Sequence, residues 1–127
     1  MIRVSLMYTA ILALIFIVLS LRVVKNRFKS KVSLGDGGNT LLNIAIRTHS
    51  NFAEYVPIAL MLLVSVEFLA YPVILVHILG SLLILARLSH VYGLANKNSL
   101  SIFRPVGVIS TVTVIVVSSI LVLVRSV

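Results

Sequence analysis

Four long apolar runs, separated by short polar segments, dominate the chain. They cover residues 4–21, 56–70, 73–86 and 106–124. A helix needs roughly 20 apolar residues to cross a bilayer, and the first and last runs approach this length unaided. The two middle runs reach it only if their helices continue into the polar residues before position 56 and after position 86. The pattern predicts four membrane-spanning helices in one domain, residues 1–127, over about 4–22, 41–69, 73–95 and 105–125.

The composition agrees with an all-α integral membrane protein. Hydrophobic residues make up 60% of the 127, and only 11 Lys or Arg and 3 Asp or Glu carry charge. Soluble domains are about 45–50% apolar and about 25% charged, so a soluble globule is excluded. Disorder is excluded by the same hydrophobicity. The chain has no Cys, so any reactive thiol must come from a ligand.

The basic residues predict the orientation in the membrane. Polar segments rich in Lys and Arg stay in the cytoplasm, which places both termini outside. The first run is expected to be a retained span, because no cleavage site follows it. The first basic loop also suits anionic lipid headgroups, whereas Phe28, its only aromatic residue, does not favour nucleic-acid binding. The basic residues of the two loops are Arg22, Lys25, Arg27, Lys29 and Lys31, and then Lys97 and Arg104.

Two contacts are predicted at the ends of the second span. Asn39 or Thr40 follows a Gly-rich turn and is a suitable cap for the helix that begins there. Glu67 and His77 lie five residues either side of Pro72. In an antiparallel hairpin they have similar depth, so we expect them to pair.

The second span carries a polar face at its cytoplasmic end. Asn43, Arg47, Asn51, Glu54 and Tyr55 recur at helical spacing. One interpretation is an interhelical network around an Arg47–Glu54 salt bridge that fixes packing. The other is a binding site, which we favour because five polar side chains on one face exceed what helix packing needs.

Arg87 and His90 share a face at the end of the third span. Arg87 can face a pocket or extend toward the headgroups, and His90 can act as a base, a donor or an interfacial residue. Arg27, Arg47 and Arg104 belong to the same half of the molecule. Arginine binds carboxylates and phosphates, so these groups with the single carboxylate of Glu54 suit a ligand with several carboxylates and one ammonium group. Three His without partner ligands predict no metal site.

The second-span segment R-T-H-S-N-F-A-E-Y-V-P resembles the R-x-x-x-N-x-x-E-Y signature of the MAPEG family, the membrane-associated proteins in eicosanoid and glutathione metabolism. The third span ends with A-R-L-x-x-x-x-G-x-A, and L-G-D-G-G-N looks like the short bacterial branch. The resemblance covers nearly the whole chain. It implies a four-helix protomer of a homotrimer in the bacterial inner membrane, with glutathione sites between subunits on the cytoplasmic side.

The resemblance also implies roles for individual residues. Glu54 would take the glutathione ammonium group, Arg47 a carboxylate or the peptide, and Arg27 another carboxylate. Arg104 matches the arginine that stabilises the thiolate and is the expected catalytic residue. The other cosubstrate-binding positions would be Asn51, Tyr55, Arg87 and His90. Leu94 departs from the second Tyr of well-studied members.

Two functions follow as expectations. The first is a membrane glutathione transferase or peroxidase, in which the glutathione thiolate attacks a lipophilic electrophile or a hydroperoxide that enters from the bilayer. The alternative is a non-enzymatic membrane scaffold that binds a small anionic ligand or lipid in the same pocket. A transporter is a distant third, because no broken-helix repeat is present.

Overall fold

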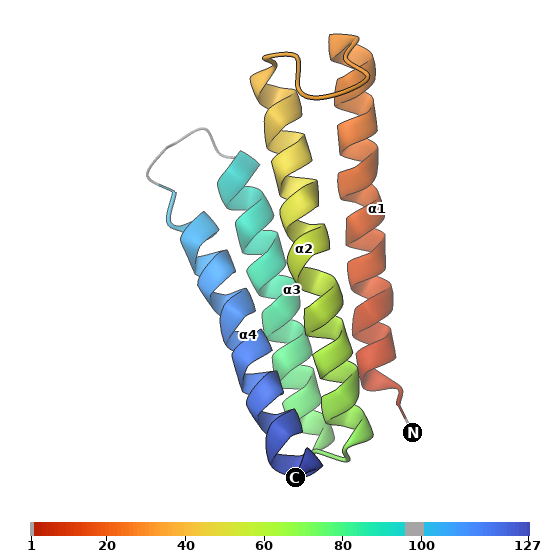
Figure 1. The fold of residues 1–127 in the computed structure, drawn as a ribbon, viewed down its shortest axis with the longest axis vertical. Coiled ribbons are helices and arrows are strands. Elements are labelled where there is room, and N and C mark those ends of the chain that lie inside the picture. The colour runs from red at the N-terminus through yellow and green to blue at the C-terminus, as the bar shows by residue number, and fades with distance from the viewer. Residues whose placement is uncertain (1, 96–100) are drawn as a thin grey trace.

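A computed structural model describes residues 2–95 and 101–127, which form an antiparallel bundle of four helices. They are α1 (Val4–Ser30), α2 (Thr40–Phe68), α3 (Val73–Ala95) and α4 (Phe103–Ser126). Each is long and apolar enough to cross a membrane, which confirms the predicted four-helix membrane bundle. Both termini lie at one end of the bundle, and the loop between α1 and α2 lies at the other (Figure 1). Lys97, assigned above to the second basic loop, lies outside the described residues.

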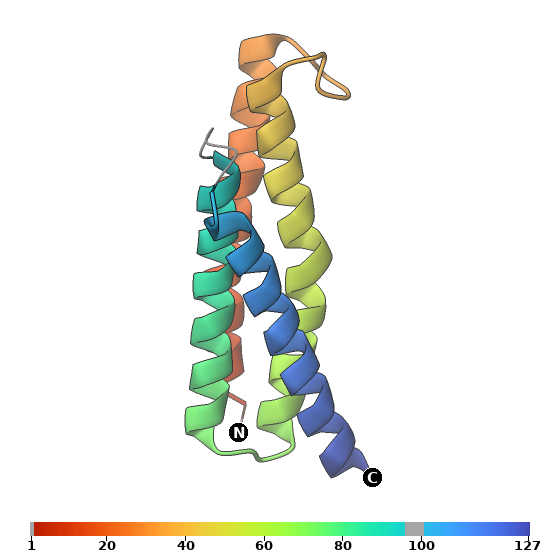
Figure 2. The ribbon, with the colours of Figure 1, turned by 90° about the vertical axis from the view of Figure 1, so that its left-hand side faces the viewer.

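Neighbouring helices in the chain also pack side by side. α1 packs against α2 and α3, while α4 packs against α3 and α2, so α4 covers the groove between those two helices (Figure 2). The core between them is apolar and fully buried, with Leu12, Phe52, Leu83 and Val114 as representatives. Many large apolar side chains point outward instead, as expected where the outer surface meets lipid.

Helix α1 continues beyond the predicted span, which ended near residue 22. It has 27 residues and at 1.5 Å per residue is about 40 Å long. The hydrocarbon core is about 30 Å thick, so the basic C-terminal part of α1 projects past it. Lys31 ends the helix in the left-handed conformation with φ 54°.

The connection from α1 to α2 is held at both ends by hydrogen bonds. Arg27 Nη1 donates to the carbonyl oxygens of Val32 at 3.3 Å and Gly35 at 2.9 Å. At the start of α2, the Asn39 side chain accepts from the backbone N–H of Leu42 at 2.9 Å. Asn39, one of the two candidates predicted from the sequence, is therefore the N-cap of α2.

Glu67 binds the N-terminus of α1 and not His77. Its carboxylate accepts the backbone N–H groups of residues 3, 4 and 5 at 2.9, 2.9 and 2.7 Å, and also the hydroxyl of Ser5. His77 Nδ1 lies 3.1 Å from the hydroxyl of Tyr8 instead. The predicted Glu67–His77 pair is wrong, because equal depth does not fix the direction in which a helix turns its side chains. Both groups face α1.

Candidate functional site

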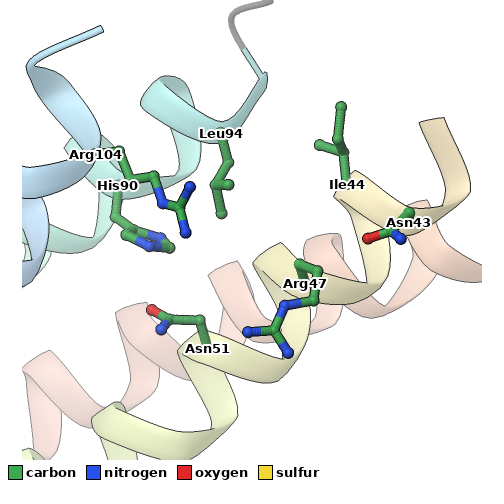
Figure 3. A pocket seen from close by; sticks show the side chains of 7 residues that line it. All are labelled: Asn43, Ile44, Arg47, Asn51, His90, Leu94 and Arg104. Carbon is green, nitrogen blue, oxygen red and sulfur yellow. The ribbon is translucent and has the colours of Figure 1, made fainter. Parts of the chain in front are cut away.

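A polar pocket of about 220 Å³ opens at the loop end of the bundle, between α2, α3 and α4. Figure 3 shows its lining side chains converging from the three helices. Two are arginines and none is a carboxylate, so the pocket suits an anion. The lining comprises Asn43, Ile44, Arg47 and Asn51 of α2, His90 and Leu94 of α3, and Arg104 of α4.

The α2 side of the pocket follows from helical periodicity. Asn43, Arg47 and Asn51 are spaced by four, so they occupy one face on successive turns. Arg47 is exposed and Asn51 partly buried. Successive turns of α2 thus present an amide, a guanidinium and a second amide to the ligand space.

Arg87 lies behind the pocket and fixes two of its lining residues. Its side chain is 0% exposed, and Nη2 donates to Asn51 Oδ1 at 2.6 Å and contacts His90 Nδ1 at 3.2 Å. Nη1 reaches the hydroxyl of Thr111 at 3.4 Å, whereas Nε has no hydrogen-bond partner among the described residues. A guanidinium only donates, so Nδ1 of His90 accepts and its Nε2 carries the proton.

Two glycines let α4 approach α3 closely enough to place Arg104 at the pocket. A Cβ at Gly93 would lie 2.8 Å from Cα of Arg104. A Cβ at Gly107 would lie 2.6 Å from both the carbonyl oxygen of Ala86 and the backbone nitrogen of His90. Real Cβ atoms essentially never come this close, so larger residues at either position would push the helices apart.

The structure brings four of the eight predicted site residues to this pocket, namely Arg47, Asn51, His90 and Arg104. Arg87 supports them from behind.

The other three predicted residues do not line the pocket within one chain. Arg27 points to its own loop, Glu54 is exposed, and Tyr55 is partly buried. Glu54 is on the face of Arg47 but seven residues further along, which is about 10 Å.

Two polar residues at or beside the pocket, Asn43 and Asp36, were not among the predicted site residues. Asn43 belongs to the predicted polar face and lines the pocket, and Asp36 binds the Asn43 amide. Asp36 lies in a Gly-rich turn, where Asp commonly binds nearby backbone N–H groups. Within residues 2–95 and 101–127, no three His, Asp or Glu side chains gather as metal ligands.

Comparison with known proteins places the chain in a family. The MAPEG family model matches residues 5–124. The inner membrane protein YecN of Escherichia coli strain K12 is 39% identical over 94 residues, which cover 74% of this chain and 72% of YecN. YecN of E. coli O6:H1 (strain CFT073) matches to the same extent. No solved structure gives a significant match. The match over nearly the whole length and the identity with YecN together show that this chain belongs to the MAPEG family.

Proposed function

We propose that this protein is an integral inner-membrane protein that binds glutathione in the pocket between Arg47 and Arg104, and uses the thiolate as a nucleophile. The lipophilic acceptor would enter from the bilayer. Membership of the MAPEG family supports the reaction class, and the four apolar helices and the name of the E. coli relative support the location. We place the termini outside and the pocket in the cytoplasmic half, following the basic loops.

The proposal rests on the positively charged hydrogen-bond donors that line and support the pocket. Arg47 and Arg104 line it from two helices, no carboxylate is among its described lining residues, and the buried Arg87 adds a third positive charge. Glutathione brings two carboxylates and a thiol. Nearby positive charge favours a thiolate over a thiol, which fits a chain that has no Cys of its own.

The proposed chemistry needs little more than positioning and charge. Arg47 would hold a carboxylate, and Arg104 would stabilise the thiolate. In the transferase reaction, sulfur forms a bond to an electrophilic carbon, and the leaving group departs with the bonding electrons. In the peroxidase reaction, sulfur attacks the terminal hydroperoxide oxygen, and the O–O bond breaks to release the alcohol and leave glutathione sulfenic acid. The thiol of a second glutathione then displaces water from this sulfur and forms the disulfide. Orientation and electrostatic stabilisation are recognised sources of rate in such sites.

A second copy of the chain would complete the site. The pocket, at about 220 Å³, is smaller than the 300–1,000 Å³ that is typical of small-molecule sites. Glu54 is exposed at the midpoint of α2, where a charge that faces lipid is costly. A homotrimer would cover Glu54 and Tyr55 and allow Arg27 of one subunit to approach the pocket of the next.

The thiolate band in ultraviolet difference spectra tests the proposal. Purified protein in detergent should show this band on addition of glutathione, and Arg104→Ala should lose it. Arg125→Ala is the matched control, because Arg125 is at the opposite end and donates to the carbonyl of Leu69. If the wild-type protein does not bind glutathione at millimolar glutathione concentrations, the proposed function is refuted.

Leu94 favours the second candidate, a non-enzymatic scaffold. It lines the pocket with an apolar side chain, so no hydroxyl is available there for the sulfur. In this case the pocket would bind an anionic lipid or small anion without turnover. Thermal stabilisation by anionic lipid and none by glutathione would favour the scaffold. Stabilisation by glutathione that Arg47→Ala removes would favour the enzyme.

A further inference from the structure

Asp36, in the loop between α1 and α2, fixes the side chain of Asn43. One carboxylate oxygen accepts from the Asn43 amide nitrogen at 2.6 Å, and the other accepts from the backbone N–H of Gly38 at 3.0 Å. The hydrogen bond from Gly38 and then that from Asn43 hold the pKa of Asp36 below its ordinary value of 3.8. At neutral pH this group is an ionised carboxylate and therefore only accepts hydrogen bonds.

The charge of Asp36 determines which way the Asn43 amide turns. A carboxylate is bound by the NH₂ group and not by the carbonyl, so Oδ1 of Asn43 must face the other way. In Figure 3 this oxygen turns toward the pocket side, where Arg104 and Leu94 lie. The loop thus presents a fixed acceptor to the ligand space.

The loop that carries Asp36 is itself anchored. Arg27 holds the carbonyl of Gly35 on one side, and Asn39 caps α2 on the other. Gly37 has φ 56°, and a Cβ there would lie 2.6 Å from Val32 Cγ2. These contacts hold Asp36 in place before a ligand arrives, so the Asn43 amide is oriented in advance.

The other polar groups of the pocket present donors. Arg47 and Arg104 have no acceptor atom. Oδ1 of Asn51 and Nδ1 of His90 are both engaged by Arg87. Among the described lining side chains, Oδ1 of Asn43 is therefore the side-chain acceptor that no protein donor engages, whereas Oδ1 of Asn51 already shares its lone pairs with Arg87.

We infer that Asn43, positioned by Asp36, is a specificity-determining residue that selects anions carrying an N–H donor near the negative charge. Such ligands are peptides, acylated amino acids and amino acids. Simple carboxylates and esters lack the donor and would leave the Asn43 oxygen without a partner. The inference deepens the proposed function, since glutathione is a peptide, but its geometry applies to any anion in this pocket.

A matched pair of small ligands tests this selection. Hippurate has an amide N–H next to a carboxylate, and benzoyloxyacetate has an ester oxygen in its place. Both are titrated, alongside glutathione, into wild-type protein in lipid nanodiscs and followed by calorimetry or NMR. We expect hippurate to bind about 3- to 10-fold more tightly than the ester, the effect of one hydrogen bond.

Variants of Asp36 and Asn43 test whether these two residues set the preference for the ligand with the N–H group. Asn43→Leu should bring the ratio of the two affinities to about one, and Asp36→Asn should lower it. The swapped pair D36N/N43D restores an amide facing a carboxylate and should recover the preference for the N–H ligand. Ser33→Ala, an exposed change in the same loop, should leave the ratio unchanged.

The outcomes distinguish this inference from the proposed function. If hippurate is preferred and Asn43→Leu removes the preference while glutathione fails to bind, the selection stands and the glutathione proposal falls. If glutathione binds wild type and Asn43→Leu equally well, the selection is overturned and the glutathione proposal stands. Equal affinities of wild-type protein for hippurate and the ester would also overturn the selection.

Discussion

Replacing Gly107 with alanine is expected to separate α4 from α3 and to displace Arg104 from the pocket. The added methyl carbon would lie 2.6 Å from the carbonyl oxygen of Ala86 and the nitrogen of His90, whereas ordinary contact begins at 3.4 Å. Both neighbours are backbone atoms of a helix and cannot rotate away. The helices must therefore part by about 0.8 Å, and such overpacking typically costs about 1–3 kcal/mol.

The effect on binding follows from the position of Arg104, one turn before Gly107 on the same helix. A charge-assisted hydrogen bond contributes about 1.5–3 kcal/mol, so its loss should weaken anion binding by about tenfold or more. Thermal denaturation in detergent measures the stability, and titration with glutathione or hippurate measures the affinity. Ile109→Ala is the control, because it shortens an exposed side chain on α4. Wild-type melting temperature and affinity in Gly107→Ala would refute the close-approach argument.

Four further changes probe other parts of the molecule. Arg87→Met should lower anion affinity at least tenfold in titrations, yet change the melting temperature little, because relief of a buried charge offsets the lost hydrogen bonds. Glu67→Ala should accelerate hydrogen–deuterium exchange in the first turn of α1, with exchange elsewhere unchanged, because that turn loses the acceptor for its N–H groups. Asn39→Ala should lower the free energy of unfolding by about 1 kcal/mol in denaturant titrations through loss of the α2 cap. Because the pKa of Asp36 is depressed, its hold on Asn43 is present at higher pH and lost as the pH falls below 3.8; the Asn43 side-chain amide resonances should change only there.

The helices were predictable because the length of an apolar run must match the thickness of the membrane. The apolar run does not indicate where a helix ends outside the membrane. Helix α1 continues to Ser30, since its Lys and Arg residues are good helix formers and can extend into water. The cap at Asn39 was predictable from local chemistry alone.

Site residues that lie together on one helix were predictable from their spacing. Contacts between two separate segments were not. The four-residue period correctly grouped Arg47 and Asn51 on one face. The period gives no information on how α2 is rotated toward its neighbours, which is why the Glu67–His77 pair was wrong. The Asp36–Asn43 contact depends on positive φ angles at Gly35, Gly37 and Gly38, and a Gly-rich sequence permits such angles without specifying the path.

The contact of Glu67 with the start of α1 has a consequence for how the chain enters the membrane during synthesis. The first residues of α1 emerge from the ribosome long before Glu67 is made, so their N–H groups must stay hydrated or be held by other partners at first. Only when α2 has crossed the bilayer in the opposite direction does its far end deliver the carboxylate. Insertion of the second helix thus completes the hydrogen bonding at the start of the first, and a chain that is truncated before Glu67 leaves these N–H groups without that acceptor.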